Sequence, residues 1–393
     1  MYDDMQVGYD ITAIALGMDA LERRLQQGGK ALDTEGLIPI YTGEDLVEPN
    51  RYADWTEAQR DLAAITAKIG ECPLDTRKSF LEALVRSLRA AIKVFRGEPT
   101  SFAYRLEHLV GVPAGPADEK VIEELREEID RALARRNIIR GSLAERVQSW
   151  QGSKFIPVEK LESEYRMLQE EAVRRTAQRV FDVGDFRMEL VLTSGTHAAG
   201  RCNFLGKTME INTDIGCTRA ALKHLVTHEN FPGHATQLLY TADAYRKGNA
   251  SADVLLCTLN GIPGVIQEGI GDQATEIIDW VEDDDDVIQI ALRRLRIAVA
   301  TTASWKLMQL GEDEQSVVRY IKETGFAINP YVDGRITQAK HIYRGPFNAS
   351  YYHGNQAVRE VRLHTPKERF GDFITYLYGR MHSLEGFLGA PWM

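Results

Sequence analysis

The segment HENFPGH, residues 228–234, constrains the fold of this chain more than any other stretch, because it places two histidines six residues apart around a proline and a glycine. On an unbroken helix, six residues turn by about 600°, so the two imidazoles would lie roughly 120° apart and could not share an ion. Pro232 removes a backbone donor, and Gly233 permits unusual backbone dihedrals. We therefore expect the helix to break between His228 and His234, so that both can bind one divalent metal ion.

A glutamate inside this segment supplies the group that metal-dependent hydrolysis needs. In the zinc-hydrolase motif HExxH the histidines bind the metal and the glutamate acts as general base, and Glu229 has the same place after the first histidine. A competing metal-binding pair is His224 and His228, whose i, i+4 spacing needs no distortion of a helix. We favour His228 and His234, because the break would otherwise have no purpose inside an amphipathic run. The remaining alternative is that all three are core or surface histidines beside a helix end.

A third protein ligand is expected, because a catalytic zinc usually has three and keeps one position open for water. Glu268 and Asp272 are spaced i, i+4 and would face the same way on a helix. One carboxylate can bind the metal while the other accepts a hydrogen bond from a ligating histidine. The alternative is an acidic helix face in water. The letters GIGDQA at 269–274 also fit a GxGxxG/A pattern, but no βαβ context surrounds them, which argues against a nucleotide site.

Together these motifs resemble domain of unknown function 885, a family of helical, gluzincin-like hydrolases distantly similar to carboxypeptidase Taq and thimet-type oligopeptidases. Residues 228–234 look like the family's HExxPGH signature, and Glu268 with the glycine after it matches the core of its EGW motif, where Ile270 replaces the tryptophan. The resemblance covers mainly residues 185–365. It implies a zincin-like fold, Glu268 as the third metal ligand, and zinc-dependent hydrolysis of peptide bonds.

Residues 344–356 resemble a further segment of that family, whose register makes Tyr351 the group that stabilises the oxyanion. A phenol or imidazole donor aimed at this developing charge can stabilise it by a few kcal/mol. Tyr352 and His353 are also candidates, with His353 second to Tyr351, because consecutive helical residues diverge by about 100°. The alternative for Tyr351 is packing against the core. A free C-terminal carboxylate on the substrate could be bound by an arginine through two hydrogen bonds. The candidates are Arg344, Arg359 and Arg362, each of which can equally be a surface ion-pair residue.

The composition of the chain argues against some classes of function. Its 393 residues include 47 basic and 57 acidic ones, and the net charge of −10 argues against sequence-independent binding to nucleic acid. No apolar run approaches the roughly 20 residues that cross a bilayer, and the N-terminus lacks the regions of a signal peptide. We therefore expect no membrane partner and a cytoplasmic location. The four cysteines include no CxxC, so neither a zinc knuckle nor a disulfide framework is indicated.

Helices are predicted for most of the chain, from apolar residues at three- and four-residue spacings. In the N-terminal half they are 10–27, 56–70, 76–96, 118–136 and 158–180. Beyond residue 185, segments 188–193 and 207–212 have the β-formers of strands in a small antiparallel sheet. The predicted fold is thus mainly α, with a helical N-terminal region, 1–184, that walls a cleft and a metal-binding catalytic region, 185–393. The two regions can form one continuous domain.

Three details of the C-terminal half bear on the site. Thr213 or Thr218 is expected to cap the helix that leads into the first histidine. The acidic run 282–286 is expected to be solvated and to cap the next helix, because it lacks the spacing and glycine of a calcium loop. That helix, 287–311, is expected to pack behind the site, and it carries Arg293, Arg294 and Arg296.

The mechanism that follows uses one divalent metal ion, preferably Zn2+, with Mn2+ or Co2+ as alternatives. Its expected ligands are His228, His234 and Glu268. Glu229 would deprotonate the attacking water and return the proton to the leaving group, Tyr351 would support the oxyanion, and Asp272 would orient a histidine. The expected partner is a peptide or small amide substrate, and a homo-oligomer is left open.

Two other classes of function remain. One is a metal-dependent hydrolase or lyase of a small non-peptide substrate, because fold and ligands do not fix the substrate. The other is a helical binding protein that keeps the motif without activity. A di-iron carboxylate bundle is set aside, because it calls for paired Glu-x-x-His motifs and none of the nine histidines has a glutamate three residues before it.

Overall fold

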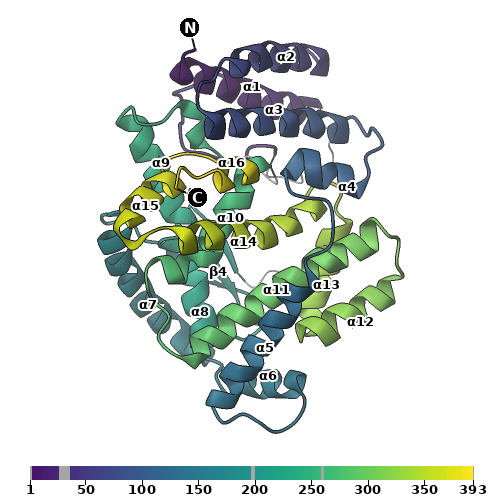
Figure 1. The fold of residues 1–393 in the computed structure, drawn as a ribbon, viewed down its shortest axis with the longest axis vertical. Helices are drawn as coiled ribbons and strands as arrows, with labels where there is room; N and C mark the ends of the chain where they lie inside the picture. Colours follow the sequence, from purple (N-terminus) through teal and green to yellow (C-terminus); the bar gives the residue numbers. More distant parts are fainter. Residues whose placement is uncertain (1, 26–35, 196–199, 258–260, 393) are drawn as a thin grey trace. The chain divides into compact units, whose positions relative to one another are not determined.

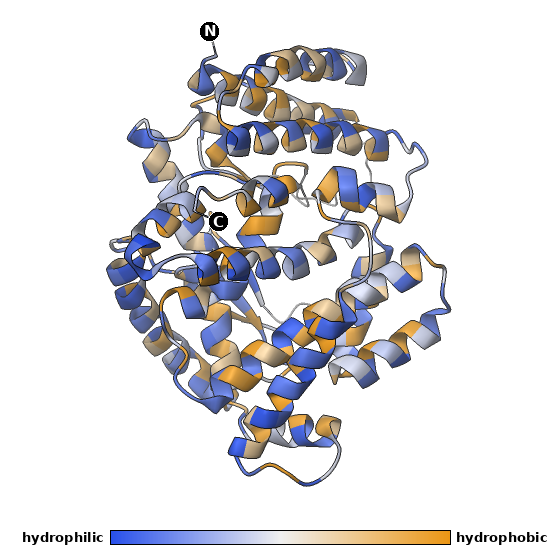
Figure 2. Ribbon diagram, in the orientation of Figure 1, coloured by the Kyte–Doolittle hydropathy of each residue, from blue (hydrophilic) through white to orange (hydrophobic). Residues whose placement is uncertain are grey.

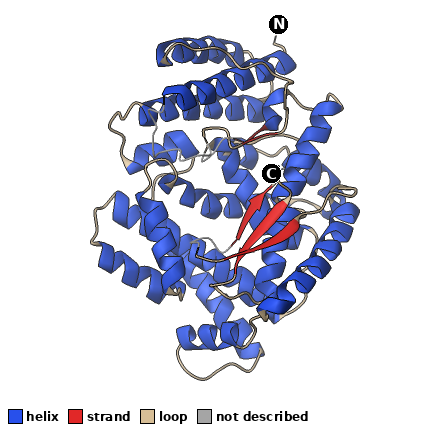
Figure 3. Ribbon diagram, turned by 180° about the vertical axis from the view of Figure 1, so that it is seen from behind, coloured by secondary structure: helices blue, strands red, loops and turns tan. Residues whose placement is uncertain are grey.

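The computed structural model describes residues 2–25, 36–195, 200–257 and 261–392, and these are mainly helical, as predicted (Figure 3). They form two compact units, one from residues 1–114, 237–269 and 341–393 and the other from 115–236 and 270–340. The boundary expected near residue 184 falls inside the second unit. Two helices run through the divisions between the units, α9 (His234–Arg246) and α10 (Ile262–Ile277).

The first unit is built from helices with one pair of very short antiparallel strands. Its elements before α9 are α1 (Asp4–Leu25), β1 (Ile40–Tyr41), α2 (Trp55–Gly70), α3 (Asp75–Phe95), α4 (Phe102–Arg105) and the π-helical turn η2 (Leu106–Val110). Between α9 and α10 lie the 3-10 turn η4 (Ala252–Leu255) and β5 (Leu256–Cys257). After residue 341 come η5 (Gly345–Phe347), α14 (Asn348–His364), η6 (Lys367–Arg369), α15 (Phe370–Tyr378) and α16 (Leu384–Leu388).

Helices α1, α2 and α3 pack together in the first unit (Figure 1). Each carries apolar residues on one side, so hydrophobic and hydrophilic positions alternate around it (Figure 2), and the apolar sides meet in one buried core. Asp54 caps α2 by accepting a hydrogen bond from the backbone N–H of Thr56 at 2.7 Å. The three helices predicted here are present, but the first begins at Asp4 rather than at residue 10, and residues 26 and 27 of its predicted range lie outside the described residues. None of the described helices combines the length and hydrophobicity needed to cross a bilayer.

The second unit is organised around one long helix, α11 (Asp284–Met308), with α5, α12 and α13 packed against it (Figure 1). Its helices are α5 (Glu119–Arg135), α6 (Leu143–Gly152), α7 (Val158–Arg179), α8 (Arg219–Leu225), the π-helical turn η3 (Val226–Asn230), α11, α12 (Glu314–Gly325) and α13 (Asn329–Lys340). The side of α11 that faces its neighbours is apolar, with Leu292 and Leu295 fully buried. The helices predicted at 118–136, 158–180 and 287–311 are confirmed as α5, α7 and α11, to within a few residues at their ends.

The predicted strands are present as β2 (Glu189–Thr193) and β4 (Thr208–Asn212) in a three-stranded sheet of order β2-β4-β3 (Figure 3). A strand that the sequence did not reveal, β3 (Gly200–Asn203), lies between them in the chain and pairs antiparallel to β4. Because β3 reverses the chain direction, β2 runs parallel to β4. The small sheet expected from the sequence is therefore present, and it is antiparallel at β3–β4 and parallel at β2–β4.

A buried cation fixes α8 to the start of α11. Lys223 is 1% exposed, and its Nζ donates hydrogen bonds to Asp286 at 2.5 Å, to Glu282 at 2.8 Å and to the carbonyl of Trp280 at 3.1 Å. Asp283 caps α11 as expected of the acidic run, but Asp286 is buried against Lys223 rather than solvated. The run thus anchors the helix that leads into the histidine motif.

We expect Lys223→Met to lower the free energy of unfolding by about 3–5 kcal/mol, because it leaves the Asp286 carboxylate buried without its cation. The matched control is Lys68→Met, which removes a solvent-exposed ion pair with Asp10 and should cost less than about 1 kcal/mol. Urea denaturation of both variants measures the difference. Equal losses would contradict the role assigned to the buried cation.

Candidate metal centre

The first histidine of the motif lies in a widened turn of helix. Thr218 caps α8 by accepting a hydrogen bond from the N–H of Ala221 at 3.1 Å, which decides between the two predicted caps. The helix then continues into η3, where the N–H of Phe231 donates to the carbonyl of Val226, five residues earlier, at 3.1 Å. Single π-helical turns of this kind are frequent at functional sites, because they displace one residue from the regular helical surface. In this chain the displaced turn contains His228.

The helix ends after Asn230 and restarts at His234, which confirms the predicted break. The Phe231–Pro232 peptide bond is cis, and the N–H of Gly233 donates to the carbonyl of Thr227 at 2.9 Å. A Cβ atom on Gly233 would overlap the backbone carbonyl of His228, so the chain can turn back here only because residue 233 has no side chain. The break depends on close backbone packing at this glycine.

The structure brings the three predicted ligands together. One ligand atom from each of His228, His234 and Glu268 lies within 4.8 Å of the others. The two imidazole rings meet edge to face, with centroids 4.8 Å apart and planes at 84°. Ligand atoms around a tetrahedral zinc lie roughly 3.3 Å apart, a difference that small side-chain rotations can close. His228 and Glu268 are buried and His234 is half-buried, so the cluster has one more accessible side.

A glycine of α10 leaves space for the His228 imidazole. A Cβ atom on Gly271 would lie 2.6 Å from Nδ1 of His228, so the ring packs directly over the backbone of α10. One turn further along, the hydroxyl groups of Thr227 and Thr275 are hydrogen-bonded at 2.9 Å. At the other end of η3, the side-chain amide of Asn230 donates to the Tyr165 hydroxyl at 2.8 Å. These contacts hold the turn that carries His228 on both sides.

His224, the competing ligand, lies outside the cluster of three. Its ring centroid is 5.5 Å from that of His228, and its side chain is buried. Burial, followed by the nearby Arg293 guanidinium, keeps the pKa of His224 well below its usual value, so the imidazole is neutral. Neither ring nitrogen has a hydrogen-bond partner among the described residues.

Glu229, the predicted general base, follows His228 in the widened turn. Its Oε1 lies 4.0 Å from Nε2 of His228, and its side chain is 16% exposed. A carboxylate that borders the cluster and still reaches solvent can exchange a proton with a water held there. The position therefore suits the predicted role without requiring a change of fold.

Asp272 contacts two guanidinium groups behind the first histidine. Its Oδ1 accepts from Nε of Arg293 at 2.8 Å, and its Oδ2 accepts from Nε of Arg294 at 3.1 Å. Burial raises the pKa of the Asp272 carboxyl, but the two guanidinium groups outweigh it and hold the pKa below its usual value. Arg293 also reaches Nδ1 of His228 at 3.0 Å, so it links the carboxylate to the histidine. The sequence placed Arg293 behind the site but did not reveal this contact.

Tyr351, Tyr352 and His353 lie on α14, which approaches the Glu268 turn of α10 closely. A Cβ atom on Gly269 would overlap the carbonyl of Gly354, so two glycines let the helices meet backbone to backbone. The segment that carries Glu268 and the segment 344–356 are therefore in backbone contact at Gly269 and Gly354. Tyr351 packs edge to face on Phe347, with ring centroids 5.7 Å apart.

His353 lies two residues beyond Tyr351 and packs on Tyr352, with ring centroids 5.0 Å apart. Burial lowers the pKa of His353 to about 4, which keeps the imidazole neutral at pH 7. Among the candidate arginines for a substrate carboxylate, Arg359 is exposed, whereas Arg344 and Arg362 are half-buried.

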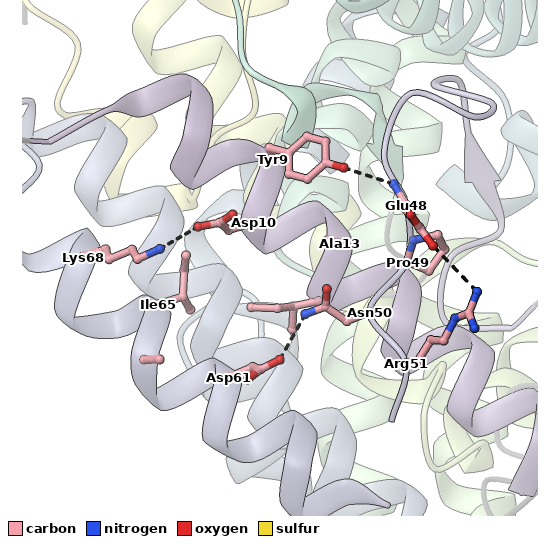
Figure 4. Close-up of a pocket in the computed structure, with 12 residues that line it drawn as sticks. Tyr9, Asp10, Ala13, Glu48, Pro49, Asn50, Arg51, Asp61, Ile65 and Lys68 are labelled. Carbon is pink, nitrogen blue, oxygen red and sulfur yellow. Dashed lines mark hydrogen bonds and ion pairs between the residues drawn. The ribbon is translucent and has the colours of Figure 1, made fainter. Parts of the chain in front are cut away.

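A cavity of about 510 Å3 lies in the first unit beside α1 and α2 (Figure 4). Its polar side chains are largely paired with one another. Lys68 is bonded to Asp10 at 2.8 Å and Asn50 to Asp61 at 3.0 Å. None of its lining residues belongs to the three motifs, so this cavity does not direct the functional assignment.

No protein-family model and no curated protein matches this chain. Two solved structures resemble its fold at 13% sequence identity. The first is a "putative lipoprotein" from Colwellia psychrerythraea, with a TM-score of 0.57 over 86% of this chain and 63% of that one. The second is a "putative lipoprotein of unknown function" from Shewanella oneidensis, with a TM-score of 0.54 over 86% of this chain and 71% of that one. This chain therefore spans less than two thirds of the length of the Colwellia protein, and at this identity the likeness is one of fold alone.

Proposed function

We propose that this protein is a zinc-dependent hydrolase of the gluzincin type, and that it is a metallopeptidase acting on peptide or small amide bonds. The observation that carries the proposal is the convergence of His228, His234 and Glu268 within 4.8 Å. Two imidazoles and one carboxylate form a donor set that suits Zn2+ and leaves a position open, and Mn2+ or Co2+ can use the same donors. A bound ion would polarise the substrate carbonyl and make a water molecule more acidic.

We assign the proton transfers to Glu229 and the support of the oxyanion to α14. Glu229 takes the proton of the attacking water and passes it to the leaving group, a role that its position 4.0 Å from His228 supports. Tyr351 donates a hydrogen bond to the oxyanion, with His353 as the alternative donor. Because His353 is neutral at pH 7, it would donate an N–H without adding a charge. The resemblance of residues 228–234 and 344–356 to the family named above supports the same assignment.

The proposal includes a peptide or small amide as partner and a cytoplasmic location. Neither nucleic acid nor membrane is a proposed partner, in line with the net charge of −10. A homo-oligomer stays open to measurement.

Elemental analysis of protein purified without a metal-binding tag tests the proposal. We expect about one equivalent of zinc in the wild-type protein, lost in His234→Ala and in Glu268→Ala. His364→Ala, which removes an exposed histidine of α14, is the matched control and should keep the metal. A peptide and amide substrate screen follows on the metal-loaded protein.

The outcomes separate the three classes of function. Zinc with peptide hydrolysis supports the metallopeptidase. Zinc with turnover of small non-peptide substrates alone would keep the hydrolase and overturn the peptidase. Absence of zinc from the wild-type protein after supplementation and dialysis would overturn the enzyme and favour a binding protein.

A further inference from the structure

Arg293 lies beside the ring nitrogen of His228 where a metal-binding histidine usually has a hydrogen-bond acceptor. Its guanidinium donates to Asp272 at 2.8 Å and lies 3.0 Å from Nδ1 of His228. A guanidinium has no acceptor, so Nδ1 of His228 accepts the hydrogen bond in this contact. Behind a metal-bound histidine the usual partner is a carboxylate or carbonyl that accepts a proton from the ring and strengthens it as a ligand. Here the Arg293 guanidinium lies between the Asp272 carboxylate and the His228 imidazole.

The ion pairs that Asp272 forms with Arg293 and Arg294 are largely buried. The Asp272 side chain is 1% exposed and that of Arg293 is 20% exposed. Arg294 holds the other oxygen of Asp272 and also pairs with Glu276 at 2.7 Å. Asp272 is thus shared between two adjacent arginines of α11, of which Arg293 is bonded to a predicted ligand. The difference between these neighbours provides a matched comparison.

We propose that Arg293 is a positioning residue that holds the His228 imidazole in place and weakens the affinity of the cluster for a divalent cation. The inference rests on the proposed function and deepens it, because it concerns the regulation of the same site. Two effects act in the same direction. A positive charge beside a ligand disfavours a second cation nearby. The bond to Nδ1 also places the proton of a neutral His228 on Nε2, so a cation can bind Nε2 only when that proton leaves or the Arg293 bond breaks, and either change makes binding less favourable.

Such tuning has a chemical use. A ligand that donates less electron density leaves the bound ion a stronger Lewis acid, because less of its charge is neutralised. The site would therefore bind the cation more weakly but make it a stronger Lewis acid. The occupied fraction of the site would then depend on the free concentration of the cation. Arg293 sets this balance through one side chain that contacts no predicted substrate group.

The test measures the dissociation constant for Zn2+ by competition with a chromophoric chelator. In Arg293→Gln we expect affinity to rise about 10-fold to 100-fold, the range typical of changes behind a metal ligand. Arg294→Gln removes a guanidinium from the same carboxylate without touching His228 and should change affinity less than about threefold. Arg293→Lys keeps the positive charge beside His228 and should therefore raise affinity less than Arg293→Gln does, and it tests the role of the charge even if the glutamine variant does not fold.

A spectroscopic signature complements the affinities. The visible absorption of the Co2+-loaded protein reports ligand geometry, and we expect it to shift in Arg293→Gln and to be unchanged in Arg294→Gln. Equal or weaker binding of Zn2+ in Arg293→Gln would overturn the inference while leaving the proposed function intact. An affinity gain in Arg293→Lys equal to that of Arg293→Gln would overturn the assignment to charge. No binding in the wild type or in any variant would overturn the proposed function itself.

Discussion

Replacing Glu229 with glutamine is expected to leave the metal bound and to lower kcat/KM by about 100-fold to 10,000-fold, the contribution typical of a general base. Glutamine keeps the size and shape of the side chain but cannot take a proton from water. The metal should stay, because Glu229 is not one of the three converging ligands and its Oε1 lies 4.0 Å from the His228 ring. Steady-state kinetics on a peptide substrate, with zinc measured on the same sample, separate the two effects.

The matched control for this substitution is Glu162→Gln, which removes the same charge from the exposed surface of α7. It should retain both zinc and activity. A Glu229→Gln protein with full activity would exclude Glu229 as the general base and leave His353 or a second carboxylate to be tested. Loss of zinc together with activity would instead make Glu229 part of the ligand set.

Local chemistry explains which features the sequence predicted. The break between His228 and His234 follows from backbone sterics at a proline and a glycine, which neighbours in the chain determine. The amphipathic spacing that predicts α2, α3, α5 and α7 is local as well, because each helix presents one apolar side to its core. Glu268 was assigned by resemblance to a family motif, and the structure brings it to the histidines from a separate helix.

Features that depend on distant partners could not be predicted. Strand β3 has only four residues and is defined by its pairing with β4, so neither this strand nor the parallel direction of β2 could be predicted from local spacing. Two compact units assembled from separate stretches of chain leave no linker for a sequence pattern to reveal. Arg293 was expected behind the site, but its contact with His228 depends on how α11 packs against η3. Periodicity shows which side of a helix is buried, whereas the atoms that it meets depend on tertiary packing.

Gly233 connects the fold to the chemistry, because the two histidines converge only where the chain turns back on itself. A Cβ atom at residue 233 would overlap the carbonyl groups of His228 and Thr227, which are backbone and cannot rotate away. The neighbouring residues Phe231 and Pro232 are buried, so the turn has little room to relax. The missing side chain is therefore required for this path of the chain, and the position of His234 depends on it.

We accordingly expect Gly233→Ala to lower the free energy of unfolding by about 3 kcal/mol and to weaken zinc binding at least about 100-fold, since it displaces His234 from the other ligands. Gly152→Ala near the end of α6 is the matched control. Its new Cβ would meet nothing within 4 Å, so stability should rise by up to about 1 kcal/mol. Urea denaturation with and without zinc measures both quantities. Equal stability and affinity in the two variants would show that the break tolerates a side chain, and the ligand geometry would then need another cause.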